Sequence, residues 1–125
     1  DVSHNPASVQ NLTTFLRTNY KDTKFNAIFS SMSDKDTVSI IKNISSFIAN
    51  WNICFIDDER FNLLEQKELI ESLTQKHVKQ FDSVYSAVKR GYHEQYPYVV
   101  FGSFITVSEA YKAIKKIKDE SSVKD

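Results

Sequence analysis

Apolar residues recur at helical spacing in five segments of this 125-residue chain, and short apolar runs lie between those segments. In the first segment, Val9, Leu12, Phe15 and Leu16 fall on one face of a helix, which predicts that this face packs against a core. The same spacing, with its capping residues, predicts helices over residues 6–19, from a cap at Ser33 through Ile48, over residues 62–74, from a cap at Asp82 or Ser83 to Gly91, and from a cap at Thr106 to Ile117.

The apolar runs between these helices predict the strands. Residues 25–30, 51–57 and 98–101 are rich in β-forming side chains, and residues 78–81 form either a brief strand or an extended link. Because these runs are apolar on both faces and alternate with helices, they predict a parallel sheet that helices cover on both sides. We therefore expect residues 1–125 to form a single α/β domain with a mostly parallel, Rossmann-like sheet and helices on both faces.

Polar side chains gather at the junctions that lead into helices. Four clusters have this position, at residues 1–5, 30–36, 57–60 and 102–106. In a parallel α/β sheet, ligands bind beyond the carboxyl ends of the strands, in the loops that lead to the helices. The sequence therefore predicts a ligand site at this edge of the sheet.

Composition narrows the class of function. The chain has 16 basic and 16 acidic residues, so it lacks the basic excess typical of proteins that bind nucleic acid or membrane surfaces. No apolar stretch reaches the length of a membrane span. Cys54 is the single cysteine, in an apolar run typical of inert core thiols, and His77 and His93 lack partners at metal-ligand spacing. We expect no metal site, no nucleic-acid partner and no membrane partner.

The glycine count and the first residues bear on nucleotide binding. With two glycines, the chain can hold neither a dinucleotide fingerprint nor a Walker A loop, so another domain would have to bind the phosphates of a nucleotide triphosphate. The chain begins with Asp-Val-Ser-His-Asn-Pro, in which Asn5 suits the cap of a helix that opens at Pro6. Because no Met precedes this polar motif, we expect a fragment that starts inside a functional segment.

Four segments together resemble the C-terminal domain of the bifunctional folylpolyglutamate synthase/dihydrofolate synthase family, in the Mur ligase superfamily. Residues 1–6 resemble its Asp-x-Ala-His-Asn-Pro signature, and residues 29–36 (FSSMSDKD) resemble a strand end followed by Asp-Lys-Asp. Residues 81–84 with Ala87, and residues 100–107 (VFGSFITV), resemble two further family segments in the same order and spacing. The departures are Ser3, Ser30 and Ile105, which replace a usual Ala or Gly, a common Gly, and a frequent His or Tyr.

The resemblance implies one domain of a two-domain, ATP-dependent ligase. ATP would phosphorylate a carboxyl group of a folate or pteroate substrate, and the amine of L-glutamate would then attack the acyl phosphate to form an amide. An N-terminal ATPase domain would carry the phosphate loop and the Mg²⁺ ligands, so isolated residues 1–125 are expected to be inactive. We expect a monomeric, cytoplasmic enzyme that adds glutamate to dihydropteroate, to tetrahydrofolate as polyglutamates, or to both.

The same resemblance implies roles for four residues. Asp1 and His4 would face the ATP cleft, Lys35 would bind a carboxylate of glutamate, and Ser103 would donate a hydrogen bond to its α-carboxylate. No catalytic residue is assigned within this domain. The alternatives are structural: Asp1 and His4 organise a turn, Lys35 forms a surface ion pair with a neighbouring acid, and Ser103 forms a turn. Arg60 follows three acidic residues and is interpreted as their ion-pair partner.

Two other functions are compatible with parts of the sequence. A muramyl-peptide ligase would share the Asp-x-Ala-His motif, although the Gly-Ser-Phe-x-Thr-Val and Asp-Lys-Asp segments favour the folate branch. A non-catalytic peptidoglycan-binding module superficially resembles residues 98–110, but this reading leaves residues 1–36 unexplained.

Overall fold

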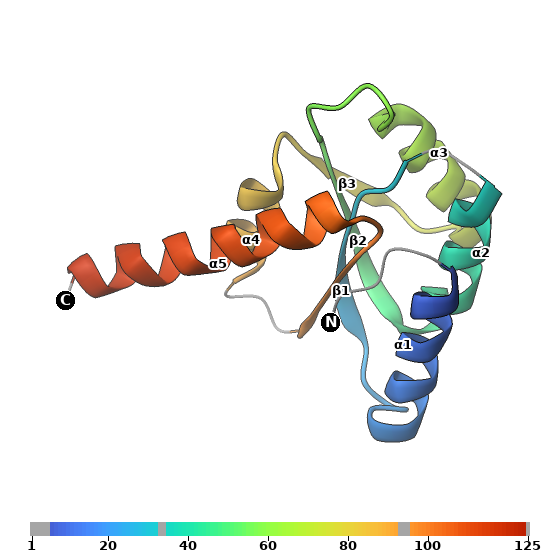
Figure 1. Cartoon of the computed structure of the whole chain (residues 1–125). Coiled ribbons are helices and arrows are strands. Elements are labelled where there is room, and N and C mark those ends of the chain that lie inside the picture. Colours follow the sequence, from blue (N-terminus) through green and yellow to red (C-terminus); the bar gives the residue numbers. More distant parts are fainter. Residues whose placement is uncertain (1–5, 33–34, 93–95, 125) are drawn as a thin grey trace.

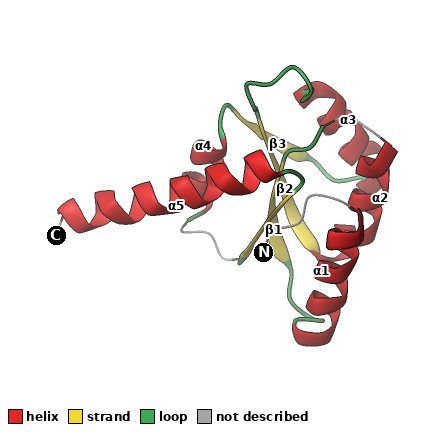
Figure 2. Cartoon of the chain, viewed as in Figure 1, coloured by secondary structure: helices red, strands yellow, loops and turns green. Residues whose placement is uncertain are grey.

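The computed structural model describes residues 6–32, 35–92 and 96–124, and within them helices and strands alternate along the chain (Figures 1 and 2). A short 3₁₀ helix, Ser45–Phe47, links the second helix to the second strand. The other elements, in order, are α1 (Pro6–Asn19), β1 (Phe25–Phe29), α2 (Lys35–Ile44), β2 (Ile48–Cys54), α3 (Leu63–Thr74), β3 (Val78–Phe81), α4 (Val84–Gly91), β4 (Tyr98–Phe101) and α5 (Phe104–Lys124).

The four strands form one parallel sheet in the order β3-β2-β1-β4. β1 is central, since it pairs with β2 on one side and with β4 on the other. The chain therefore builds the sheet outward from β1 through β2 to β3, and then returns through α4 to place β4 on the opposite side of β1. This arrangement confirms the predicted parallel, Rossmann-like α/β fold.

Helices cover both faces of the sheet, and each face has its own core (Figure 1). On one face, Leu12 and Leu16 of α1 and three isoleucines of α2 join the inward residues of the strands and Ile70 of α3. On the other face, α4 and α5 pack small and β-branched residues against Ile28 and Cys54. Burial on both faces explains why the strands read as nearly continuous apolar runs.

An aromatic cluster fills the first core. The rings of Phe29, Trp51 and Phe101 come from three neighbouring strands, and their centroids lie 4.9 to 6.0 Å apart in tilted or edge-on contacts. Each of the three side chains is at most 1% exposed. The prediction that Trp51 belongs to the core is confirmed, whereas Phe15, expected on the buried face of α1, is 50% exposed.

Several predicted boundaries were wrong. Ile48 continues the helical spacing of α2, yet it begins β2 and pairs with Phe25. β2 accordingly spans residues 48–54 rather than 51–57, and β1 ends at Phe29 rather than Ser30. Residues 78–81, which the sequence left open, form the edge strand β3. In each case strand pairing, which is a tertiary interaction, decides the boundary.

The start of the last helix also differs from the prediction. We expected Thr106 to cap it, but α5 begins at Phe104, and the Ser103 hydroxyl accepts a hydrogen bond from the Thr106 amide at 3.1 Å. The cap of α4 is Ser83, whose hydroxyl accepts from the Ser86 amide at 3.0 Å, and this agrees with one of the two predicted caps. The predicted caps Asn5 and Ser33 lie outside the described residues.

Within the described part of the chain, no helix is both long enough and apolar enough to cross a bilayer. The four lysines near the end of the sequence lie on the exposed face of α5, as expected for a solvated face: Lys112, Lys115, Lys116 and Lys118.

Candidate functional site

The strand order creates one place where neighbouring loops diverge. β1 and β4 lie side by side, but the chain leaves β1 toward α2 on one face of the sheet and leaves β4 toward α5 on the other. A crevice at such a reversal of strand order is the usual ligand site of open α/β sheets. The loops after β1, β2 and β4 meet here, so three of the four polar clusters predicted to share this edge do so.

Buried hydroxyl groups tie these loops together. The Ser30 hydroxyl, at the end of β1, donates to the carbonyl oxygen of Cys54 at the end of β2, over 2.9 Å. The Thr106 hydroxyl donates to the carbonyl oxygen of Ser30, also over 2.9 Å, which fastens the start of α5 to β1. Ser30 and Thr106 are both fully buried, so these bonds are shielded from water. The edge of the sheet is therefore held by direct polar contacts between loops.

Gly102 permits the close approach of the last loop to β1. Its φ is +117°, a conformation that side chains with a Cβ rarely adopt, and an added Cβ would lie 2.5 Å from the carbonyl oxygen of Ser30. A glycine is thus required at this position for both backbone and steric reasons.

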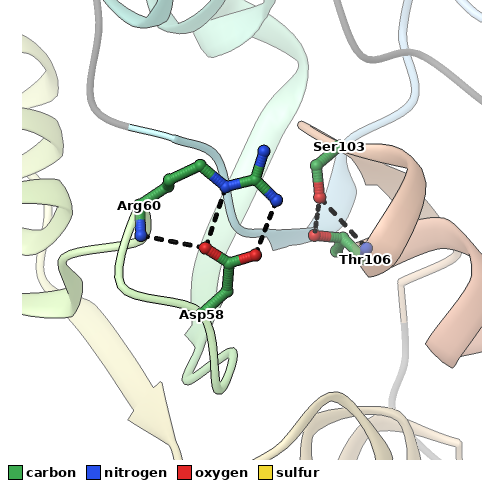
Figure 3. A network of polar contacts seen from close by, with 4 residues as sticks. All are labelled: Asp58, Arg60, Ser103 and Thr106. Atoms are coloured by element: carbon green, nitrogen blue, oxygen red, sulfur yellow. Dashed lines mark hydrogen bonds and ion pairs between the residues drawn. The ribbon is translucent and has the colours of Figure 1, made fainter.

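Ser103 is nearly buried and its hydroxyl is already engaged. The Ser103 side chain lies 7% exposed, and its Oγ is 2.7 Å from the Thr106 Oγ1. Since the single Thr106 hydroxyl proton goes to the Ser30 carbonyl, which can only accept, the proton in the Ser103–Thr106 contact comes from Ser103. Figure 3 shows this contact. In this structure, the Ser103 proton is therefore donated within the protein, and the role of Ser103 toward glutamate stays a prediction.

Arg60 faces the same region from the loop after β2. Its Nε and Nη2 donate to the two oxygens of Asp58 at 2.9 and 2.6 Å, and its backbone amide donates to Asp58 Oδ1 at 2.9 Å (Figure 3). These hydrogen bonds lower the pKa of the Asp58 carboxyl to about 2. The sequence interpretation of Arg60 as an ion-pair partner is confirmed, with Asp58 as the acid.

A side chain that the sequence analysis missed holds the loop after β1. Gln66 of α3 is 1% exposed, and its Oε1 accepts a hydrogen bond from the Ser31 amide at 2.9 Å. The sequence does indicate this role, because Gln66 falls on the same face of the helix as Leu63 and Ile70, where a polar residue is unusual. A lone glutamine on an apolar stripe therefore marked a buried hydrogen bond.

Two pockets open at this edge. The first, which we call the switch-point pocket, has a volume of about 210 Å³ and lies between the loops after β1, β2 and β4. The second, which we call the acidic pocket, has a volume of about 420 Å³ and lies between the loop after β2 and the starts of α4 and α5. The switch-point pocket is lined by Gly102 and by Met32, Arg60, Phe61, Ser103, Phe104 and Ile105. The acidic pocket carries the carboxylates of Asp57, Asp58, Asp82 and Glu109.

The structure brings together only some of the residues that the sequence analysis singled out. Ser103 lies at the switch-point pocket, and Lys35 is the first residue of α2, which follows the loop from β1. The side chain of Lys35, and Asp1 and His4 entirely, lie outside the described residues. Among the described side chains, no group of three or more His, Cys, Asp or Glu residues has an arrangement that could hold a metal ion.

Comparison with known proteins gives the fold a precedent. A structure of the bifunctional folylpolyglutamate synthase/dihydrofolate synthase of Yersinia pestis matches 92% of this chain with a TM-score of 0.76 at 24% identity. The chain has the fold of the folylpolyglutamate synthase C-terminal domain. The Helicobacter pylori folylpolyglutamate synthetase matches 93% of the chain with a TM-score of 0.72, and E. coli FolC matches 94% with 0.75, both at 25% identity. No protein-family model and no curated protein sequence matches the chain.

The resemblance read from the four motifs is thus confirmed for the fold of the folylpolyglutamate synthase domain. The chain spans 28% of the length of each of these three structures. The Yersinia pestis protein was solved with AMPPNP and a Mn ion, and the E. coli protein with DHPP and ADP. These two proteins therefore bind nucleotide in chains that are much longer than this one.

Proposed function

We propose that this chain is the C-terminal domain of an ATP-dependent ligase that adds L-glutamate to dihydropteroate, to tetrahydrofolate, or to both. The observation that carries the proposal is the match of nearly the whole chain to folylpolyglutamate synthase structures from several bacteria. The loops at the switch point support it, since they place a cation and an engaged serine around a small pocket where strand order reverses.

In the proposed reaction, a carboxylate oxygen of the folate or pteroate substrate attacks the γ-phosphorus of ATP and releases ADP. The unprotonated amine of L-glutamate then attacks the acyl carbon, phosphate leaves, and the nitrogen loses a proton as the amide forms. An N-terminal ATPase domain supplies the phosphate loop and holds Mg²⁺, because two glycines in this chain cannot form that loop. Closure of the two domains excludes the water that would otherwise hydrolyse the acyl phosphate.

The proposed roles of this domain follow the sequence analysis. Asp1 and His4 contact the ribose or phosphates of ATP, and Lys35 binds a carboxylate of the incoming glutamate. Ser103 donates a hydrogen bond to the α-carboxylate of glutamate after its hydroxyl rotates away from Thr106, to which it donates in this structure. The enzyme is proposed to be cytoplasmic and monomeric, and residues 1–125 alone are proposed to be inactive.

A ligase assay tests the proposal. In an enzyme that joins this chain to an N-terminal ATPase domain, ADP release should require dihydropteroate or a folate together with L-glutamate. Lys35→Ala should raise the KM for glutamate by roughly 10-fold or more through loss of a charged partner, while the KM for ATP changes by less than about twofold. Lys21→Ala, an exposed lysine beyond α1, is the matched control.

Three outcomes would contradict parts of this proposal. Turnover by residues 1–125 alone would remove the need for a second domain. An unchanged glutamate KM in Lys35→Ala would exclude Lys35 from the site. Activity with muramyl peptides rather than folates would assign the chain to the muramyl branch. For His4→Ala, a raised KM for ATP with unchanged thermal stability supports the nucleotide role, whereas loss of folding supports the structural alternative.

A further inference from the structure

The switch-point pocket presents one cationic side chain to a ligand. Met32, Phe61, Phe104 and Ile105 supply most of its wall, and Arg60 is its charged member. At about 210 Å³, the pocket is smaller than the roughly 300–1,000 Å³ typical of sites for drug-sized molecules. It therefore suits one arm of a small metabolite, with a polar end at Arg60 and an apolar stem along the wall.

Asp58 fixes the direction in which Arg60 points. The carboxylate of Asp58 holds the Nε and Nη2 side of the guanidinium, so the Nη1 amino group is left on the side away from Asp58. The Arg60 side chain lines the switch-point pocket and is 60% exposed, so a ligand in the pocket can reach its guanidinium. A guanidinium can bridge two carboxylates through its separate edges, and one that is already oriented loses less entropy on binding.

The charges around the pocket favour an anion on the Arg60 side. The first turn of α5, a helix of 21 residues, has no acidic residue, and its N-terminus carries the positive end of the helix dipole next to the pocket wall. The carboxylates of Asp57, Asp82 and Glu109 line the neighbouring acidic pocket, together with that of Asp58, which also pairs with Arg60. A carboxylate ligand would be repelled there, whereas the switch-point pocket offers it the guanidinium of Arg60, whose charge Asp58 offsets in part.

In this state the Ser103 hydroxyl does not donate a hydrogen bond to a ligand, so Arg60 is left as the side-chain donor. The Ser103 hydroxyl proton is directed to Thr106, whose own proton is directed to the Ser30 carbonyl. Among the described residues that line the pocket, Arg60 is the one whose side chain carries N–H groups.

We propose that Arg60, oriented by Asp58, binds a carboxylate of the amino-acid substrate in the switch-point pocket. The identity of the substrate as L-glutamate rests on the proposed function, but the carboxylate chemistry of the pocket does not. Arg60 is thus a specificity-determining residue, and Asp58 is a positioning residue that acts through it.

The binding test uses residues 1–125, labelled with ¹⁵N and titrated with L-glutamate, glutarate and L-glutamine. Glutamate and glutarate should shift the Arg60 Nε–H resonance and the Ser103 amide resonance. If L-glutamine shifts them equally, the α-carboxylate is bound, and if it does not, the side-chain carboxylate is bound. Both results support the proposal, because glutarate has no amine and L-glutamine keeps only the α-carboxylate.

Variants separate the charge from its orientation. Arg60→Gln should weaken glutarate binding by roughly 10- to 100-fold, as expected for loss of a charge-assisted hydrogen bond. Arg60→Lys should restore part of the affinity, and Asp58→Asn should give an intermediate loss because the cation stays but is no longer held. Arg17→Gln, at the far end of α1 in its last turn, is the matched control and should bind as the unaltered chain does.

The proposal is overturned if glutarate shifts neither resonance, if the shifts map to α4 and the acidic pocket, or if Arg60→Gln binds as tightly as the unaltered chain. Its failure is distinct from failure of the proposed function. Glutarate binding at Arg60 in a protein without folate ligase activity would refute the ligase and keep the carboxylate site. Folate ligase activity with an unchanged glutamate KM in Arg60→Gln would refute the carboxylate site at Arg60 and keep the ligase.

Discussion

At the scale of single residues, the candidate site consists of polar groups that constrain one another. The Ser103 hydroxyl donates to Thr106, Thr106 donates to Ser30, and Ser30 donates to Cys54, so one chain of hydrogen bonds crosses three strand ends. These hydrogen bonds fix the loops, and in them the hydroxyl protons of both serines and of the threonine are donated within the protein. In this state, a ligand must therefore bind to other side chains at the mouth of the pocket, of which Arg60 is the charged one.

The Asp58–Arg60 pair makes a prediction about pH. The pKa of Asp58 is lowered from 3.8 to about 2, chiefly by the side-chain hydrogen bonds of Arg60. A folded-state pKa below the ordinary value means that the pair stabilises the fold above about pH 4 and that this contribution is lost as the pH falls through 2. The carboxyl ¹³C titration of Asp58 should show the low midpoint, and Arg60→Gln should return it toward 3.8.

A second variant provides the control for this titration. Arg17→Gln, in the last turn of α1, should leave the midpoint of Asp58 where it is in the unaltered chain. A midpoint of Asp58 near 3.8 in the unaltered chain would mean that the ion pair does not persist in solution, and it would also remove the basis for an oriented Arg60.

The sequence predicted which loops form the site, but not how their side chains are used. Ser103 was correctly placed at the edge of the sheet, yet its engagement with Thr106 depends on Gly102, whose φ of +117° turns the chain back toward Ser30. Arg60 was correctly paired with an acid, yet spacing alone could not show that the pair lines a pocket with Ser103. These are features of three-dimensional packing between segments that are distant in sequence.

At the scale of elements, local signals predicted the helices better than the strands. α1 and α3 begin and end within one residue of the predicted bounds, and α3 has a local cap, since Asn62 accepts from the Glu65 amide at 3.0 Å. Ile48 was misassigned because its spacing continues that of α2, while its pairing with Phe25 belongs to the sheet. Helix caps are encoded within a few residues, whereas strand bounds depend on the neighbouring strand.

The turn between β4 and α5 depends on a glycine at position 102. Gly102→Ala should lower the free energy of unfolding by about 1–3 kcal/mol, because a Cβ at positive φ is strained and would also contact the Ser30 carbonyl. Urea denaturation measures the loss. The exposed Ser108→Ala in α5 should stay within about 0.5 kcal/mol of the unaltered chain. An unchanged stability in Gly102→Ala would mean that this loop has a different backbone conformation in solution.

At the scale of the whole molecule, the sheet separates two cores that meet through the strands. Ile28 and Cys54 face α4 and α5, while Phe29 and Ile53 face α1, α2 and α3. The alternation of side chains along a strand sends neighbouring residues to opposite cores. Neither core can therefore be lost without exposing the strands that support the other, and we expect cooperative unfolding.

Cys54 reports on this cooperativity. Burial raises the pKa of its thiol to about 12, so the reactive thiolate is scarce at neutral pH. At pH 8, the native chain should react with a disulfide reagent at least about a thousandfold more slowly than the urea-unfolded chain, because burial adds blocked access to the shortage of thiolate. Since Cys54 is the only cysteine, Cys54→Ser gives the background. Fast labelling of the native chain would instead show local opening at the end of β2.

The central place of β1 has a consequence for biosynthesis. One of its neighbours, β4, follows it far along the chain, and Asn26 cannot pair with Tyr98 until the segment between them has been synthesised. Until then, one side of β1 has open backbone groups that could join strands of other nascent copies. Translation speed and chaperone access while the segment from β1 to β4 is being made should therefore govern how much correctly assembled protein a cell obtains.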